Sequence, residues 1–294
     1  MASSAYEAQV KLTMNISHIS DILQLDLQSF IPIILIIALS GFISGLSGFG
    51  FSAVGIAVLW ILPPTRAIPL LMALSIANQL LSISQLKKDM LPLRQWWSHG
   101  PATYILGGFA GVPLGIWIMA NLPAAELSLA TGFVLLAYAA WMTFKPQTYA
   151  LQTSGTLQHM GVGMLGGIVG GFTAFPGCAV VIWAGLRNMA KNEQRSIVQP
   201  YILAMQFAAL FGMIFFRSGD LTRNPFDQTF WVLFLLLIPV VLPMTNLGVK
   251  TFKKLSDINF KSITLGVLAF SGSGLVWKSS THLLLLVNAV SFVK

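Results

Sequence analysis

Charge is scarce in this sequence. Only 9% of its 294 residues are Asp, Glu, Lys or Arg, whereas soluble domains contain roughly 25%. Hydrophobic residues make up 55% of the chain, and long apolar runs recur from Ile31 almost to the last residue. These runs lack the short in-and-out alternation of a β-barrel. The composition therefore predicts an all-α polytopic membrane protein.

Cysteine and histidine are also scarce. The single Cys178 excludes an internal disulfide, and the four histidines lack the close spacing of a metal site. We therefore expect no metal, no cofactor and no catalytic residues. The net charge of +8 lies in short basic clusters between apolar runs, a pattern that orients membrane proteins rather than one that binds nucleic acid. The expected partners are the lipid bilayer and a small solute.

Carboxylates are missing from the interior of the apolar runs. The nine acidic residues fall between these runs or at their edges. Cation carriers and proton pumps generally place a carboxylate within the membrane. This absence favours a small anionic substrate.

Several segments have the length that a bilayer core of about 30 Å requires of a helix. They are 68–86, 101–122, 127–144, 197–216, 229–249 and 262–277. Two further apolar regions, 31–62 and 160–186, are too long for a single crossing. Glycine-rich stretches interrupt them at 48–50 and 174–177. Each of these two regions is therefore predicted to be a broken helical segment.

The two broken segments resemble each other. "SGFISGLSGFGFSAVGIAV" at 40–58 aligns with "GGIVGGFTAFPGCAVVIWA" at 166–184, which places Phe49 on Phe175 and Ser47 on Thr173. An arginine, Arg66 or Arg195, then opens the next span in each half. The sequence predicts a tandem duplication in which each repeat has one broken segment and three transmembrane helices.

The predicted organisation follows from this duplication. It comprises an N-terminal interfacial helix or tail at 1–30, a first repeat at 31–145, a linker at 146–159, a second repeat at 160–278 and a short C-terminal interfacial segment at 279–294.

The basic residues favour an inverted arrangement of the repeats. If each broken segment crossed the membrane, the cations would divide 8 to 9 between the two sides. If each segment returns to the side it left, the repeats are inverted and one side collects 11 cations against 6. We expect the richer side to be cytoplasmic and both termini to lie outside. The 11 cations on the richer side are Lys87, Lys88, Arg94, Lys145, Arg187, Lys191, Arg195, Lys250, Lys253, Lys254 and Lys261.

The paired breaks resemble those of a known family. "GLSGFGFSAVG" and "GGFTAFPGCAVVIW", with "TRA" opening the span after the first break, are similar to the sulfite exporter TauE/SafE family of membrane permeases. The similarity covers residues 33–277. It departs from the family pattern at Phe49 and Phe51, where a glycine triplet is usual, and at Cys178 and Ala179, where a subgroup has two prolines. The resemblance implies a multi-pass inner-membrane permease for sulfite, sulfonates or other small organic anions.

The candidate substrate-binding residues fall into three groups. The breaks supply hydroxyls and backbone N–H groups at helix ends, which favour anions, the spans supply polar side chains, and the arginines supply forked donors that suit a sulfonate. The groups are Ser47, Gly48, Gly50, Thr173 and Gly177; Asn78, Gln79 and Gln206, with Asn246 and Gln199 as weaker candidates; and Arg66 and Arg195.

Each group also has a structural interpretation. Glycines four residues apart, as in Gly41 and Gly45, are typical of helix-packing seams. Amides within spans can hold helices together, and arginines near span ends can contact head groups or simply mark the cytoplasmic side.

The sequence favours a secondary transporter that works by alternating access, but other classes stay open. A non-transporting subunit or sensor would need no cavity, and a channel would give flux that does not saturate. Gly45–Leu46–Ser47–Gly48 also fits the loop of an intramembrane hydrolase, which needs a histidine within reach of the serine. No histidine lies inside a full predicted span. A homodimer is a further alternative for the assembly.

Overall fold

The structure is a computed structural model that describes residues 27–87, 90–97, 100–121, 124–144, 151, 155–173, 175–215 and 226–291. These residues form helices and connecting turns, and no strand occurs among them. Five of the described helices are long and apolar enough to cross a membrane. The predicted fold class, an all-α polytopic membrane protein, is confirmed. The predicted N-terminal helix or tail lies almost wholly outside the described residues.

The helices of the first half follow the predicted pattern. A short 3₁₀ turn, η3 (Leu93–Gln95), lies in the loop between the helices at Pro64–Leu86 and Ala102–Asn121. In order they are α2 (Leu27–Ser47), α3 (Gly50–Gly55) with its 3₁₀ extension η1 (Ile56–Trp60), α4 (Pro64–Leu86), α5 (Ala102–Asn121) and α6 (Ala124–Phe144).

The second half repeats this order of elements. Its helices are α7 (Thr156–Thr173), α8 (Gly177–Leu186), α9 (Lys191–Phe215), α10 (Gln228–Lys254) and α11 (Asp257–Ser291). Both glycine-rich interruptions are therefore breaks between two helices. α11 runs on without interruption past Lys278, so the predicted C-terminal segment begins inside a helix rather than after one.

Each broken segment folds back on itself. Gly48 has a φ of +87°, a conformation that glycine adopts without strain, and it reverses the chain after α2. α3 then runs back along α2. Its last residue, Gly55, lies close to Ser40 of α2, since a Cβ on Gly55 would be 3.4 Å from the Ser40 hydroxyl oxygen. In the second half, the Leu151 N–H donates to the Leu186 carbonyl over 3.0 Å. The end of α8 therefore lies beside the chain that leads into α7.

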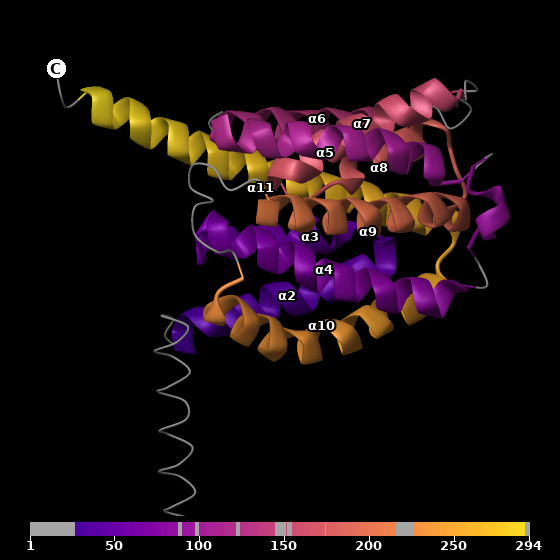
Figure 1. The fold of residues 1–294 in the computed structure, drawn as a ribbon, viewed down its shortest axis with the longest axis horizontal. Helices are drawn as coiled ribbons and strands as arrows, with labels where there is room; N and C mark the ends of the chain where they lie inside the picture. The colour runs from indigo at the N-terminus through magenta and orange to yellow at the C-terminus, as the bar shows by residue number, and fades with distance from the viewer. Residues whose placement is uncertain are drawn as a thin grey trace, which may run out of the picture.

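The broken helices pack on helices from the other half of the chain. α2 lies along α10 at one edge of the molecule, and α7 lies along α5 near the opposite edge, with α4 and α9 between them (Figure 1). Glycine seams make both contacts. A Cβ on Gly45 would overlap the Thr245 carbonyl, and one on Gly111 would overlap the Met164 carbonyl. The structural interpretation of these glycines as packing seams is confirmed.

Four chain segments rich in cations meet at one end of the bundle. The Leu91 N–H donates to the Ser196 hydroxyl over 3.2 Å, and Lys253 Nζ donates to the Gln85 carbonyl over 3.5 Å. We call this region the cation-rich end. Its described cations are Lys87, Arg94, Arg187, Lys191, Arg195, Lys250, Lys253, Lys254 and Lys261. Lys88 and Lys145 lie outside the described residues.

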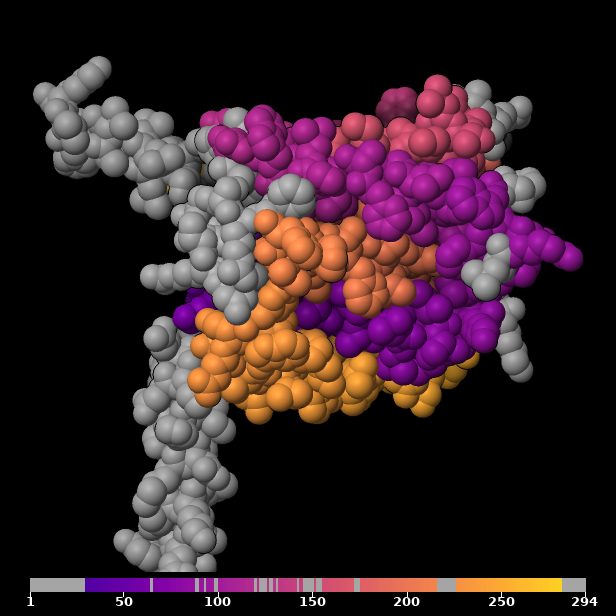
Figure 2. All heavy atoms as spheres, viewed as in Figure 1, coloured from indigo at the N-terminus to yellow at the C-terminus, as the bar shows by residue number. Residues whose placement is uncertain are grey.

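The outward side chains are apolar, as lipid contact requires. Large residues such as Phe211, Trp231 and Leu235 are 64%, 52% and 66% exposed. Figure 2 shows one such face, on which α9 emerges between α4 and α5. A water-soluble protein rarely exposes contiguous apolar surface of this kind.

Candidate functional site

The two breaks meet inside the bundle. The rings of Phe49 and Phe175, which the sequence alignment pairs, stack with their centroids 6.2 Å apart and 13° between their planes. Both side chains are buried. Gly177, the first residue of α8, lies against them, since a Cβ there would be 3.6 Å from Phe49 Cβ. The structure therefore brings residues more than a hundred positions apart into one centre.

Ser47 holds the first break together. Its hydroxyl donates to the Ile43 carbonyl over 2.8 Å and accepts from the Gly50 N–H over 3.1 Å. The Phe49 N–H lies 3.4 Å from the same oxygen. The hydroxyl is thus engaged by the chain itself. The side chain of Thr173, the aligned residue of the second break, lies outside what the structure describes.

Gln79 supports the reversal at Gly48 from the side of α4. Its Nε2 donates to the Gly48 carbonyl over 3.0 Å, and its Oε1 accepts from Gln199 Nε2 over 3.0 Å. A Cβ on Gly48 would lie 3.2 Å from Arg195 Cγ, so glycine also makes room for the arginine. These contacts join α4 and α9 to the end of α2.

Arg195 is buried and binds the end of α2. It is 3% exposed, which excludes contact with lipid head groups. Its guanidinium donates to the Gly45 carbonyl over 2.6 Å, to the Leu46 carbonyl over 3.1 Å and to the Ser82 hydroxyl over 2.9 Å. A cation is favourable here, because the last carbonyls of a helix carry partial negative charge. We call these contacts the Arg195 clamp.

Among the residues that the structure describes, Arg195 has no acidic partner. The guanidinium carbon lies 4.1 Å from the centroid of the Phe252 ring, and no carboxylate of the described residues forms an ion pair with it. Its Nε has no hydrogen-bond partner within the described part of the chain. A buried positive charge without a buried negative one favours an anion nearby.

A row of polar contacts continues along the interface of α4 and α9. Gln199 Nε2 lies 2.9 Å from the Ser82 hydroxyl, and further along Gln206 Nε2 donates to the Ser75 hydroxyl over 2.8 Å. The Oε1 atoms of both glutamines are buried and lack a partner among the described residues. Unsatisfied buried oxygens are uncommon. This interface therefore has two hydrogen-bond acceptors that the described residues do not use.

Asn78 faces the other side of α4. Its Nδ2 donates to the Ser44 hydroxyl over 2.6 Å, and its Oδ1 accepts from the Thr245 hydroxyl over 2.8 Å. These two bonds join α2, α4 and α10. The side chain acts here as a link between helices.

Arg66 lies apart from the other candidates. It sits in the first turn of α4, and its Nε is 4.0 Å from Asp227 Oδ2 just before α10, where both side chains are partly exposed. The structure thus gathers Ser47, Gly48, Gly50, Gln79 and Arg195 at the first break, with Gly177 across Phe49. Gln206 of α9 lies further along the interface with α4, Asn78 lies on another side of α4, and Arg66 lies near the opposite end of α4.

Several residues at this centre were not expected from the sequence. Ser82 bridges Arg195 and Gln199, Phe252 covers the guanidinium, and Thr245 completes the Asn78 contacts. Serine and threonine are common in membrane helices, and their spacing gives no indication of these partners. Only the neighbouring polar residues of α4 and α9 signal that this interface is polar.

The described fold defines a class of protein. Broken helices that meet within a bundle of membrane-spanning helices are the architecture of membrane transporters. The chain belongs to the sulfite exporter TauE/SafE family, whose model matches residues 33–275. Members of this family are membrane transporters rather than enzymes. Searches of curated proteins and of solved structures gave no match.

Proposed function

We propose that the chain is a secondary transporter of a small sulfur-containing anion, such as sulfite or a sulfonate, in the inner membrane. The substrate would bind between the two breaks, with Gln79, Gln206 and Arg195 as the polar side chains nearest to it. The observation that carries this proposal is the contact of Phe49 with Phe175, which brings the two breaks together.

The packing supports two inverted repeats. α2 and α10 run in the same direction, since Gly41 faces Val241 while Gly45 faces Thr245. α5 and α7 also run in the same direction, as the glycine contacts of Gly107 and Gly115 indicate. Thus α5 of the first half packs along the broken helix α7 of the second half, and α10 of the second half packs along the broken helix α2 of the first half. A two-fold axis between the repeats produces such an exchange, and because each break folds back toward the side it entered, three crossings per half would invert the second repeat.

Alternating access would then be a movement of one half against the other around the paired breaks. The rings of Phe49 and Phe175 fill the space between the breaks in this structure, so they would have to separate to admit an anion. The polar row of α4 and α9 would become accessible on that separation. The charge of Arg195 would offset that of the substrate.

Flux into proteoliposomes tests the proposal. We expect saturable uptake of sulfite or ethanesulfonate, counted with isotope or as current, and uptake of acetate alone would contradict a sulfur-containing substrate. Flux that rises linearly with concentration would indicate a channel instead. No flux of any of the three, from protein with helical content intact by circular dichroism, would contradict the proposed function.

A further inference from the structure

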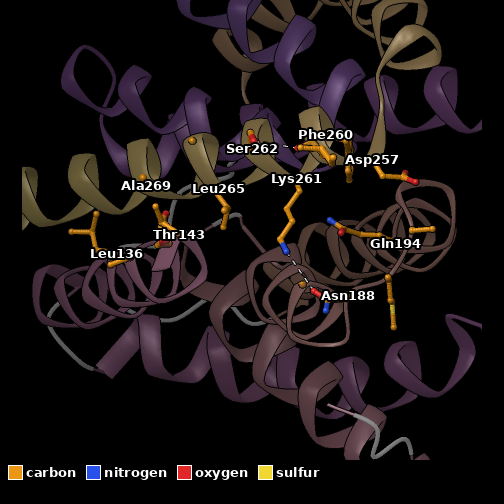
Figure 3. Close-up of a pocket in the computed structure, with 17 residues that line it drawn as sticks. Leu136, Thr143, Asn188, Gln194, Asp257, Phe260, Lys261, Ser262, Leu265 and Ala269 are labelled. Carbon is orange, nitrogen blue, oxygen red and sulfur yellow. Dashed lines mark hydrogen bonds between the residues drawn. The ribbon is translucent and has the colours of Figure 1, made fainter. Parts of the chain in front are cut away.

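A large cavity opens at the cation-rich end, and none of the residues assigned above to the paired breaks lines it. It has a volume of about 970 Å³ and lies between α6, α11 and the turn that joins α8 to α9 (Figure 3). Leu136 and Ala139 of α6 and Leu265 and Ala269 of α11 give it apolar walls. Such a volume suits a small organic ligand.

One cation points into this cavity. Lys261, in the second turn of α11, extends its Nζ to within 3.4 Å of Asn188 Oδ1 (Figure 3). No carboxylate of the described residues pairs with it. Asp257 also lines the cavity, but its Oδ1 accepts from the Lys191 N–H over 3.2 Å, and Figure 3 shows the carboxylate turned away from Lys261.

A buried amide faces the same space. Gln194 of α9 is only 6% exposed, and its Nε2 forms no hydrogen bond with the described residues. Its amide points toward Lys261 (Figure 3). Buried amide donors normally have a partner, so an unpartnered one beside a cavity indicates a ligand that accepts hydrogen bonds.

We propose that this cavity is a second anion-binding site, in which Lys261 and Gln194 hold an oxyanion while the walls of α6 and α11 contact an apolar group attached to it. The ligand chemistry is that of a short alkanesulfonate. An acidic phospholipid carries the same chemistry, an oxyanion joined to an apolar chain, and is the other source of such a ligand.

The role of this site in transport, though not the binding itself, rests on the proposed function. If the chain transports anions, the cavity is the place where the substrate gathers at the cation-rich end before it reaches the breaks. The amphiphilic lining favours alkanesulfonates over sulfite itself, because sulfite has no apolar group to place against Leu136 and Leu265.

Direct binding tests the site separately from transport. Isothermal titration of 1-propanesulfonate into the full chain in phosphatidylcholine nanodiscs is expected to show saturable binding. Lys261→Gln should weaken that binding roughly ten- to hundredfold, the range for loss of a charge-assisted hydrogen bond. Gln194→Leu should weaken it severalfold and leave thermal unfolding unchanged, because the amide donor has no partner to lose among the described residues.

Lys254→Gln is the matched control. It removes the same charge from the same end, at an exposed position of α10 outside the cavity, and should leave binding unchanged. If Lys254→Gln weakened propanesulfonate binding as much as Lys261→Gln does, the effect would come from the overall positive charge of this end, and the proposed site would be overturned.

The second ligand source and the transport proposal have their own readouts. Retention of phosphatidylglycerol that depends on Lys261, without propanesulfonate binding, would assign the site to a lipid. Binding of neither ligand through Lys261 would overturn the inference even if flux is saturable. Propanesulfonate binding through Lys261 in a chain that moves no anion would preserve the site and overturn transport.

Discussion

Replacing Arg195 should show how much the Arg195 clamp stabilises the fold. Arg195→Met keeps the length of the side chain but leaves the Gly45 and Leu46 carbonyls without their donor. A buried group left without a partner costs roughly 1–3 kcal/mol, so two such carbonyls amount to about 2–6 kcal/mol. Relief from burying the charge offsets part of this. We expect a net loss of about 2–4 kcal/mol.

Arg195→Lys sharpens the same prediction. It retains the buried charge but has no planar fork to reach two carbonyls and Ser82 together, and it stacks less well on Phe252. We expect it to be at least as destabilising as Arg195→Met. The measurement is unfolding of the purified protein by added sodium dodecyl sulfate, followed by circular dichroism in mixed micelles.

The aligned arginine of the other half provides the control. Arg66 is partly exposed and 4.0 Å from Asp227, and such pairs contribute about 0–1 kcal/mol. Arg66→Met should therefore unfold close to the wild type. Wild-type unfolding of both Arg195 variants would refute the clamp, and equal losses at Arg66 and Arg195 would show that position in the repeat, rather than burial, decides the effect.

Three further predictions concern the breaks and the repeats. Ser47→Ala, combined with Thr173→Ala, should raise the substrate concentration for half-maximal flux severalfold, whereas Ser84→Ala, an exposed serine of α4, should not; normal transport by the double variant would contradict the site at the breaks. Gly48→Ala should lower stability by about 1–3 kcal/mol in the same unfolding assay, because alanine is strained at a φ of +87°, while Gly266→Ala, which has open space around it, should be tolerated. In a Cys178→Ala background, cysteines at positions 94 and 188 should react with a membrane-impermeant maleimide from the same side of the membrane, and labelling from opposite sides would exclude inverted repeats.

The sequence predicted the elements of the fold better than their partners. Glycine-rich interruptions at 48–50 and 174–177 are visible in the chain because glycine and proline end helices, and the helices do end there. The glycine seams were also recognisable from their spacing. Which helix each seam faces depends on the path of the whole chain, so the pairing of Gly45 with Thr245 could not be predicted.

The site shows the same limit. Polar residues within spans pointed to Gln79 and Gln206, and the arginine that opens the span after the second break pointed to Arg195; all three lie in the interior. Their partners include backbone carbonyls at Gly45, Leu46 and Gly48, which carry no signal in the sequence because every residue has one. The cavity at Lys261 escaped prediction for another reason. It is lined by α6, α11 and the turn that joins α8 to α9, which lie far apart in the sequence, and a lysine near a helix end is typical of any membrane protein.

The pairing of α2 with α10 also has a consequence for biosynthesis. The packing surface of Gly45 is covered only when Thr245, 200 residues later in the chain, has been made. At about 5–20 residues per second, the ribosome needs roughly 10–40 s to make the intervening chain. During that interval α2 presents its glycine face to lipid or to the insertion machinery. Separately made halves would each carry such an uncovered helix. Neither half can therefore bury the glycine face of its broken helix without the other half.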